Sequence, residues 1–332
     1  MAKIGVFGAG TWGVALARML AKNGHRVQLW SALKSELDAI RETGEQPNLP
    51  GVDIPKSLEL TEDLETLCRG KDLLLNVVSS PYVRETFRRA AAYIPKDQLI
   101  VNASKGIEAD GLLTLCDVIR QEAGEGVTVA VLSGPTHAEE VARDLPTTIV
   151  AACENWEAAR QVQEIFTNPL MRVYTNDDVL GTELCGALKN VIALAAGVSD
   201  GLGFGDNAKA AIITRGLTEM RRLGEKMGAQ AETFWGLAGV GDLIVTATSR
   251  HSRNNRCGQL MGSGLSVKVA VAQVGQVVEG LNALPAAIRL ADQYEVDMPI
   301  TRGLDSIVNQ GAEPREAVRA LMERAPRRED ED

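Results

Sequence analysis

GAGTWG, residues 8–13, is the most informative stretch for the fold of the first half of this chain. It follows a short apolar run at residues 3–7, which predicts a buried strand, and precedes small and apolar residues typical of a helix packed on a sheet. In this spacing Gly8 permits a tight turn, Gly10 lets the backbone approach a pyrophosphate, and Gly13 lets helix and strand pack closely. The stretch therefore predicts a dinucleotide-binding turn, with the phosphates at the start of the helix.

Alternation of apolar strands with helices continues through the first half. The predicted strands lie at residues 3–7, 26–30, 72–78, 99–103, 127–132, 147–152 and 171–174. Residues 41–60 carry several prolines and predict a loop. Near residue 178 the alternation stops, and the pattern beyond it is helical.

The fold expected from this pattern is an α/β N-terminal domain with a Rossmann-type doubly wound sheet, followed by an all-α C-terminal domain. We expect the NAD(P)-binding domain at residues 1–178 and a helical substrate-binding and catalytic domain at residues 179–325. The charged residues 326–332 predict a disordered tail.

Composition narrows the class of protein. The chain has 332 residues, 45% hydrophobic and 24% charged, and no apolar run near the roughly 20 residues that span a bilayer. Its net charge of −9 argues against a nucleic-acid partner. A strand so close to the N-terminus leaves no room for a secretory signal, and the five scattered cysteines are expected to be reduced thiols. We expect a cytoplasmic protein without an integral membrane segment or a metal site.

The end of the second strand bears on the choice of cofactor. Enzymes that prefer NAD usually place an acid there, but Ser31-Ala32-Leu33-Lys34 supplies none before Glu36. This leaves NADPH open as well as NADH, with Ser31 and Lys34 as candidate phosphate contacts. The alternative is that Lys34 is a solvated surface lysine.

Two further strand ends carry polar residues. One strand ends in Ser104-Lys105-Gly106 and another in Ser133-Gly134-Pro135-Thr136. Ligands of open parallel sheets bind beyond the carboxyl ends of the strands, so Lys105 is expected to face the cofactor cleft. His137 follows directly, but the sequence identifies no acidic partner for it, and we assign it a structural role.

Lys189 is the candidate for proton transfer. It stands in a run of small and apolar residues, and its neighbours three and four positions away on the helix include no acid. A buried ammonium is costly unless it has a function or a distant partner, and desolvation favours the neutral amine that proton transfer requires. The alternative is a lysine that extends from a half-buried helix to water.

Two later stretches add polar groups, and a third is rich in glycine. Asp242 follows a glycine turn and is either a helix N-cap or an acceptor for a substrate hydroxyl. Arg250, Arg253 and Arg256, interleaved with Ser and Asn, suit a phosphate group, unless they form a solvated face. The glycine-rich residues 197–209 predict a loop that packs closely on another element.

These stretches, in this order, resemble those of the bacterial-type NAD(P)-dependent glycerol-3-phosphate dehydrogenases. The resemblance runs along nearly the whole chain and rests on seven motifs, which are GAGTWG at 8–13, SKG at 104–106, SGPT at 133–136, LKN at 188–190, GVGDL at 239–243, SRN at 252–254 and GQVVEG at 275–280. It implies reversible reduction of dihydroxyacetone phosphate to sn-glycerol 3-phosphate for phospholipid synthesis, with NADPH or NADH as cofactor. A homodimer is also expected from it.

The resemblance also implies residue roles, with Lys189 as the proton donor. The residues it assigns to the substrate are Lys105, Gly134, Thr136, Lys189, Asp242, Ser252, Arg253 and Asn254. Those it assigns to the cofactor, besides Gly8, Gly10 and Gly13, are Thr11, Trp12, Lys105, Ala138, Arg253, Val277 and Glu279. Ala32 departs from the family, where a basic residue or histidine is common, which weakens the expectation of NADP binding.

Three alternatives remain open on the sequence. A reductase of the same build acting on a hydroxy acid could use Arg253 for a carboxylate. A sugar-nucleotide dehydrogenase would need a nucleophilic cysteine, for which Cys185 is a poor candidate because no base is recognisable beside it. A non-catalytic NAD(P)H sensor would bind the cofactor without turnover.

Overall fold

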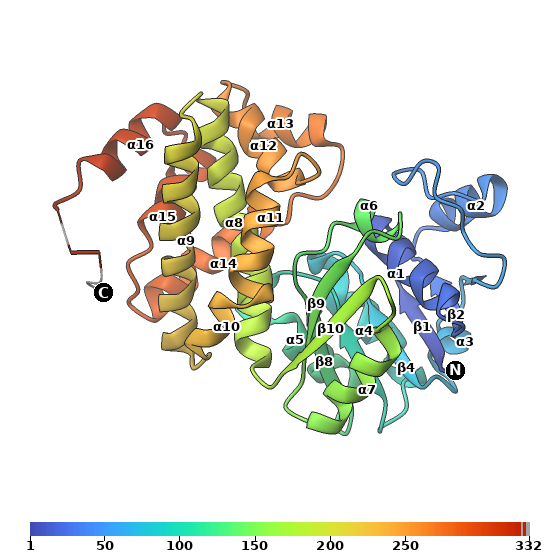
Figure 1. Cartoon of the computed structure of the whole chain (residues 1–332). Coiled ribbons are helices and arrows are strands. Elements are labelled where there is room, and N and C mark those ends of the chain that lie inside the picture. The colour runs from blue at the N-terminus through green and yellow to red at the C-terminus, as the bar shows by residue number, and fades with distance from the viewer. Residues whose placement is uncertain (327, 330–332) are drawn as a thin grey trace. The chain divides into compact units, whose positions relative to one another are not determined.

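The computed structural model describes residues 1–326 and 328–329. The chain forms two compact units (Figure 1). The first comprises Met1–Lys105 and Thr114–Val179, and the second comprises Gly106–Leu113 and the chain from Leu180 onward. The predicted tail at 326–332 falls largely on residues 327 and 330–332, which lie outside the described residues.

The first unit contains an eight-stranded sheet with the order β10-β9-β8-β5-β4-β1-β2-β3. Its strands are β1 (Lys3–Phe7), β2 (Arg26–Trp30), β3 (Glu59–Thr61), β4 (Leu73–Asn76), β5 (Leu99–Asn102), β8 (Thr128–Ser133), β9 (Thr147–Ala152) and β10 (Met171–Asn176). Neighbouring strands are parallel except β8 and β9, which are antiparallel. The chain adds strands outward from β1 on one side and from β4 on the other, which confirms the doubly wound fold and places its switch point between β1 and β4.

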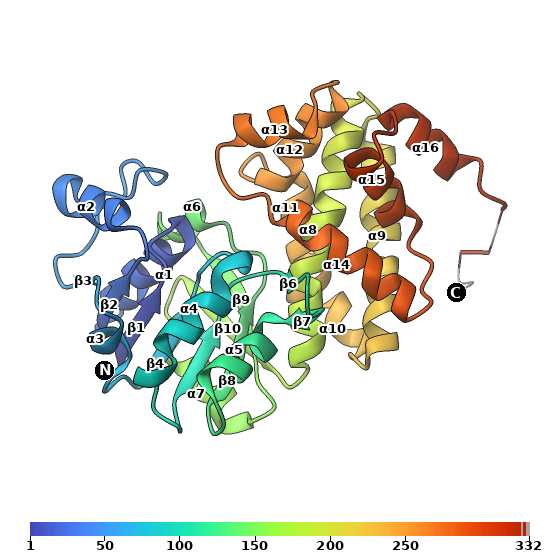
Figure 2. The same ribbon diagram turned by 180° about the vertical axis from the view of Figure 1, so that it is seen from behind.

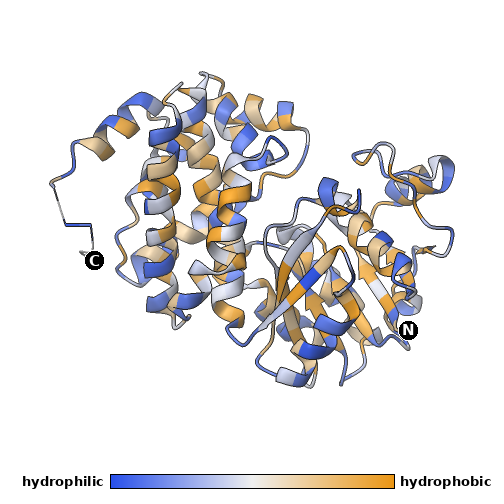
Figure 3. Cartoon of the chain, in the orientation of Figure 1, coloured by the Kyte–Doolittle hydropathy of each residue, from blue (hydrophilic) through white to orange (hydrophobic). Residues whose placement is uncertain are grey.

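Helices accompany this sheet. They are α1 (Thr11–Lys22), α2 (Lys34–Thr43), α3 (Leu64–Cys68), α4 (Val83–Ala90), α5 (Leu115–Ala123), α6 (Ala138–Val141) and α7 (Trp156–Phe166), with two short 3₁₀ turns, η1 (Ser80–Tyr82) and η2 (Ala91–Tyr93). The central strands β1, β4 and β5 are mostly apolar, and much of the sheet is orange in Figure 3. The predicted loop at 41–60 is shorter than expected, because α2 continues to Thr43 and the short edge strand β3 begins at Glu59.

The second unit is helical. Its helices are α8 (Val179–Gly201), α9 (Asp206–Met227), α10 (Ala231–Trp235), the π-helical turn η3 (Leu237–Gly241), α11 (Asp242–Thr248), α12 (Arg253–Gly262), α13 (Val267–Val274), α14 (Glu279–Gln293), α15 (Pro299–Asn309) and α16 (Pro314–Met322). By length and composition α8 could cross a membrane, but 89% of its most apolar window is buried inside the protein. α8 is therefore a core helix here.

One segment of the first half packs with the helices. Residues 106–113 carry the short strand β6 (Ile107–Glu108), which pairs with β7 (Leu113–Thr114) and lies beside α14 (Figure 2). Ile107 is buried in the helical core, and the Arg289 guanidinium on α14 donates to the Ala109 carbonyl. The sequence-based range 1–178 did not anticipate this excursion, because two-residue strands leave no periodic pattern.

The glycine-rich stretch at 197–209 is mostly helix, so the prediction of a loop was wrong there. Gly197 and Gly201 lie in the last turns of α8, where a Cβ on either would come within 2.1 Å and 2.2 Å of backbone oxygens of α12. Gly258 and Gly262 on α12 make the reciprocal approach to α8. The close packing that the sequence predicted is therefore real, and it joins two helices through their backbones.

Candidate active site

The glycine turn fits a pyrophosphate. The Gly8 N–H donates to the Trp30 carbonyl at 2.8 Å, and Gly8 has a φ of +107° that favours glycine. A Cβ on Gly13 would lie 1.9 Å from the Gly8 carbonyl oxygen, so only glycine allows α1 to start so close to β1. A Cβ on Gly10 would have no other described atom within 4 Å, which leaves an open approach to the backbone there.

The start of α1 also suits an anion. Gly10 is its N-cap, and within the described residues no side chain caps it and no acid occupies its first turn. Thr11 begins the helix, and the Trp12 indole N–H donates to the Ala103 carbonyl at 3.2 Å, just beyond β5. Trp12 thus ties α1 to the end of β5, which is separated from β1 by β4. Ala138 begins α6 and packs on the core of the same unit.

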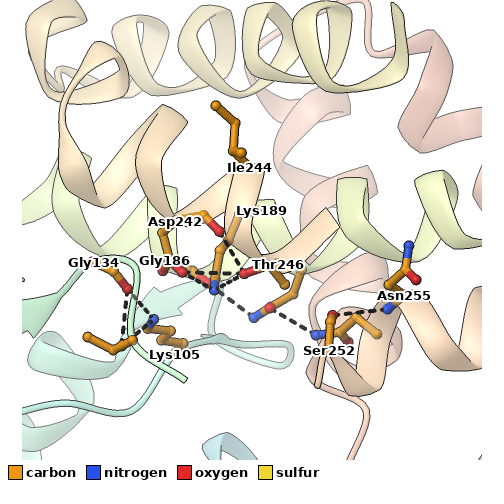
Figure 4. Close-up of polar contacts among 12 residues, drawn as sticks. Lys105, Gly134, Gly186, Lys189, Asp242, Ile244, Thr246, Ser252 and Asn255 are labelled. Atoms are coloured by element: carbon orange, nitrogen blue, oxygen red, sulfur yellow. Dashed lines mark hydrogen bonds and ion pairs between the residues drawn. The ribbon is translucent and has the colours of Figure 1, made fainter. Parts of the chain in front are cut away.

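Lys105, Gly134 and Thr136 form one polar cluster beyond the ends of β5 and β8. Figure 4 shows Lys105 and Gly134 of this cluster. The Lys105 ammonium donates to the Gly134 carbonyl at 3.1 Å and lies 3.5 Å from the Thr136 hydroxyl. That hydroxyl donates to the same carbonyl at 3.1 Å. The structure therefore brings together three residues that the sequence assigned to the substrate from two separate motifs.

Lys189 is buried, with 5% exposure, and its ammonium has a distant partner. Nζ lies 2.5 Å from Asp242 Oδ1 and 2.7 Å from the Thr246 hydroxyl (Figure 4). Asp242 is itself 1% exposed. A lysine held this way does not extend to water, so that alternative is wrong, and the buried charge is compensated by an ion pair and a hydrogen bond.

The backbone around Asp242 explains how this carboxylate reaches Lys189. The π-helical turn η3 leads directly into α11, and Asp242 is the first residue of that helix, with Gly241 as its N-cap. A Cβ on Gly239 would lie 2.0 Å from the Phe234 carbonyl oxygen, so the turn is built on close backbone approach. Asp242 is not the N-cap that the sequence allowed, and its carboxylate is directed to the ammonium instead.

Thr246 is a further site residue, which the sequence did not predict. Its hydroxyl donates to the backbone carbonyl of Asp242 at 2.6 Å, which leaves the oxygen to accept from Lys189. The available signal was its spacing, because a residue four positions after an acid lies on the same face of a helix.

Around the start of α12, Ser252 acts as N-cap and accepts from the Asn255 N–H at 3.2 Å. Arg253 is the first residue of this ten-residue helix, is exposed, and makes no hydrogen bond or ion pair with any residue that the structure describes. Of its neighbours, Arg256 lies 3.5 Å from the Gln273 carbonyl, and Arg250 is exposed. Arg253 therefore combines a free guanidinium with a helix N-terminus, which is a favourable arrangement for an anion.

Asn254 bridges three helices. Its amide donates to Asn190 Oδ1 on α8 at 2.9 Å, and its carbonyl oxygen accepts from the Gly280 N–H on α14 at 2.8 Å. This fixes the start of α12 relative to Lys189 and the start of α14. Val277 precedes α14 and Glu279 is its first residue, so the last two residues assigned to the cofactor lie at that end of the helix.

The structure also places His137 and Cys185, to which the sequence gave little weight. His137 is the N-cap of α6, where its side chain makes no capping bond. Cys185 is fully buried in the helical core, so the attack of its thiol on a substrate is not supported. Across residues 1–326 and 328–329, no group of three His, Cys, Asp or Glu side chains could hold a metal ion.

Comparison with known proteins identifies the family. Models of the NAD-dependent glycerol-3-phosphate dehydrogenase N-terminus and C-terminus match residues 3–159 and 178–319. A glycerol-3-phosphate dehydrogenase [NAD(P)+] 2 from Lactobacillus delbrueckii subsp. bulgaricus is 56% identical, with 99% of each chain covered. One named glycerol-3-phosphate dehydrogenase [NAD(P)+] from Bacillus velezensis is 47% identical, covering 100% of this chain and 97% of that protein.

Solved structures agree with this assignment. A glycerol-3-phosphate dehydrogenase from Coxiella burnetii has a TM-score of 0.94 and 40% identity, over 97% of this chain and 99% of the other. One from yeast, Saccharomyces cerevisiae, has a TM-score of 0.82 and 26% identity, over 97% and 99%. The chain belongs to the NAD-dependent glycerol-3-phosphate dehydrogenase family and is an NAD(P)-dependent oxidoreductase.

Proposed function

We propose that this enzyme reduces dihydroxyacetone phosphate reversibly to sn-glycerol 3-phosphate and that Lys189 is the proton donor. The observation that carries the assignment of Lys189 is its buried ammonium, held 2.5 Å from Asp242 and 2.7 Å from Thr246. The product supplies the glycerol phosphate backbone of phospholipids. We further propose that the enzyme works in the cytoplasm as a homodimer.

The chemistry divides between cofactor and protein. When bound, the reduced nicotinamide supplies the hydride. As the carbonyl carbon accepts it, negative charge develops on the carbonyl oxygen, and a lysine ammonium can neutralise that charge and donate the proton. In the reverse direction the neutral Lys189 amine accepts the hydroxyl proton. Asp242 and Thr246 hold Nζ in place, so little reorganisation is needed during the reaction.

The phosphate of the substrate would be held mainly by Arg253. Its exposed guanidinium starts α12, where Ser252 and Asn254 fix the first turn through their hydrogen bonds. A bidentate contact to phosphate would orient a three-carbon substrate that offers few other handles. We assign Lys105, Gly134 and Thr136 to the substrate as well, with their hydrogen-bonded arrangement as support.

The cofactor would bind at the glycine turn of the first unit. We assign its phosphates to the start of α1, where Gly8, Gly10 and Gly13 leave the backbone accessible. The further contacts we propose are Thr11, Trp12, Lys105, Ala138, Arg253, Val277 and Glu279.

A direct test measures oxidation of NADH and NADPH with dihydroxyacetone phosphate and, separately, with unphosphorylated dihydroxyacetone. We expect turnover that requires the phosphate. Lys189→Met should lower kcat by a factor of about 10² or more while cofactor affinity stays near that of the unaltered protein. Arg253→Gln should mainly raise KM for the phosphorylated substrate.

Three results would contradict the proposal. Tight cofactor binding without turnover would favour a sensor. Turnover of a 2-oxo acid in preference to the phosphorylated ketone would favour a hydroxy-acid reductase. Unchanged kcat in Lys189→Met would remove Lys189 from the chemistry.

A further inference from the structure

The carboxyl end of β2 adjoins the glycine turn. Trp30, its last residue, pairs in register with Phe7 at the end of β1, and its carbonyl accepts the Gly8 N–H at 2.8 Å. Ser31 follows at once and is buried, with 6% exposure. In a dinucleotide-binding sheet, the residues at this point read the 2′ position of the adenosine ribose.

A carboxylate does lie at the end of β2, although its residue, Glu36, comes five positions after Ser31 in the sequence. The Ser31 hydroxyl donates to Glu36 Oε2 at 2.5 Å and accepts from the Leu33 N–H at 3.1 Å. Glu36 is in the first turn of α2 and half-buried, and the bond to Ser31 holds its carboxylate beside the strand end. Its other carboxylate oxygen, Oε1, has no hydrogen-bond partner among the described residues.

Residues 32–34, which follow the end of β2, offer little to a 2′-phosphate. Ala32 has no charge, and Leu33 is an apolar residue with 59% exposure. Lys34 is exposed and makes no hydrogen bond or ion pair within the described part of the chain, so nothing fixes its ammonium at the strand end. Ser31 was a candidate phosphate contact on the sequence, but its hydroxyl donates its proton to the Glu36 carboxylate.

We infer that Glu36, positioned by Ser31, accepts a hydrogen bond from the 2′-hydroxyl of the adenosine ribose. The enzyme therefore prefers NADH to NADPH. The inference rests on the proposed function, because it takes residues 8–13 as the site of the cofactor phosphates. A neutral ribose hydroxyl gains a charge-assisted hydrogen bond to Oε1, whereas a 2′-phosphate brings a second negative charge against the same carboxylate.

The test is binding of each cofactor to the full chain, measured by fluorescence titration without substrate. We expect the dissociation constant for NADH to be about tenfold or more below that for NADPH. Glu36→Gln should weaken NADH binding and strengthen NADPH binding, so that the ratio falls by about tenfold. Glu42→Gln, which removes an equal charge near the other end of α2, should leave the ratio unchanged.

Two further variants separate the effect of holding the Glu36 carboxylate in place from the effect of its charge. Ser31→Ala keeps the charge of Glu36 but no longer holds its carboxylate in place, so the variant should bind NADH more weakly. The remaining repulsion between Glu36 and the 2′-phosphate of NADPH should fall with added salt. Glu36→Gln combined with Ala32→Arg should bind NADPH in preference to NADH, because an arginine then faces the phosphate.

Several outcomes would overturn the inference. These are tighter binding of NADPH than NADH by the unaltered protein, an equal effect of Glu36→Gln and Glu42→Gln, or a selective tenfold loss of NADPH binding in Lys34→Gln. A clear NADH preference in a protein that does not reduce dihydroxyacetone phosphate would uphold the inference and contradict the proposed reaction instead. Loss of binding of both cofactors in Gly10→Trp is expected on either account and verifies that the titration reports this turn.

Discussion

Lys189 and Asp242 stand 53 positions apart in the chain, yet their charged atoms lie 2.5 Å apart in the core of the helical unit. Both side chains are nearly fully buried, with exposures of 6% and 1%. Each charge makes the burial of the other tolerable, because an isolated ion in this place would cost several kcal/mol. The pair therefore serves the fold and the proposed proton transfer at once.

Replacing Asp242 with Asn should impair both roles, and the two effects can be measured separately. The variant leaves the Lys189 ammonium buried without its counter-ion, and we expect the free energy of unfolding to fall by about 3 kcal/mol. The residual folded enzyme should lose kcat by a factor of about 10² or more, since Nζ is no longer held. Chemical denaturation and steady-state kinetics at a temperature where the variant is folded measure the two effects.

Thr246, the other partner of the Lys189 ammonium, allows two matched variants to be compared. Thr246→Ser keeps the hydroxyl that accepts from Lys189 and should retain most of kcat, whereas Thr246→Val removes it and should lower kcat by about tenfold. Equal activity of the Ser and Val variants would show that this hydroxyl does not position the ammonium.

The sequence predicted Lys189 but neither of its partners. Its apolar surroundings indicate burial, and burial of an ammonium demands a partner. Which residue pairs with the Lys189 ammonium depends on how η3 and α11 pack on α8, and no local sequence pattern predicts that contact. The glycine turn, by contrast, was predicted residue by residue, because its constraints act within the few positions between β1 and α1.

Because α8 and α12 approach closely, replacing a glycine at their contact with alanine should lower the stability of the protein more than usual. A Cβ on Gly258 would lie 2.1 Å from the Leu194 carbonyl oxygen, so Gly258→Ala must push the helices apart. We expect a loss of about 2 kcal/mol or more in the free energy of unfolding, with a raised KM because α12 carries Arg253. Thermal unfolding and kinetics measure both.

Gly303 is the control, since it is also helical. A Cβ there would meet only ordinary contacts, at 3.6 Å and 3.9 Å from Leu321 atoms. Gly303→Ala should be neutral or stabilising by up to about 1 kcal/mol, because alanine is the better helix former. Similar losses in the two variants would contradict the role of close approach at Gly258.

Asp144 anchors a buried arginine in the first unit. It lies 2.9 Å from the Arg18 guanidinium and 2.5 Å from the Lys22 ammonium. Burial alone would raise the pKa of Asp144, but these two cations outweigh it and hold the pKa below its ordinary value. The ion pairs therefore contribute stability above the ordinary pKa of about 4, and that stability is lost as the pH falls through the lowered value.

Asp144→Asn should lower the free energy of unfolding by about 1–2 kcal/mol at pH 7, with the difference shrinking below about pH 4. Asn tolerates the positive φ of 59° at this position, so backbone strain does not confuse the result. Asp53 is the control, because it pairs with the same Arg18 but is 85% exposed. Asp53→Asn should lower the free energy of unfolding clearly less than Asp144→Asn does, and an equal loss would contradict the importance of burial.

No motif in the sequence indicated a role for Glu219, because that role depends on hydrogen bonds to a distant part of the chain. It is 2% exposed on α9, and its carboxylate accepts from the Ile300 and Thr301 N–H groups at 2.6 Å and 3.1 Å and from the Thr301 hydroxyl at 2.9 Å. It thereby satisfies the start of α15, a helix with no side-chain cap of its own. Long-range capping of this kind links residues some 80 positions apart, which no local rule predicts.

Glu219 should make the stability of the helical unit depend on pH. Burial raises the pKa of Glu219 to about 7, from an ordinary value of 4.5, against the opposing effect of its three donors. The folded state therefore favours the protonated carboxyl. The stability this confers is complete below about pH 4.5 and falls by about 3 kcal/mol as the pH rises through 7.

Glu219→Gln cannot ionise, so its unfolding should lack this pH dependence. Compared with the variant, the unaltered protein should be relatively more stable at pH 5 than at pH 8, measured as the difference between their thermal unfolding midpoints. Glu225→Gln on the same helix replaces an acid whose carboxylate pairs with Arg221 near the surface, and it should run parallel to the unaltered protein. Parallel curves for Glu219→Gln as well would mean that the carboxylate stays ionised in the folded state, with its three donors outweighing burial.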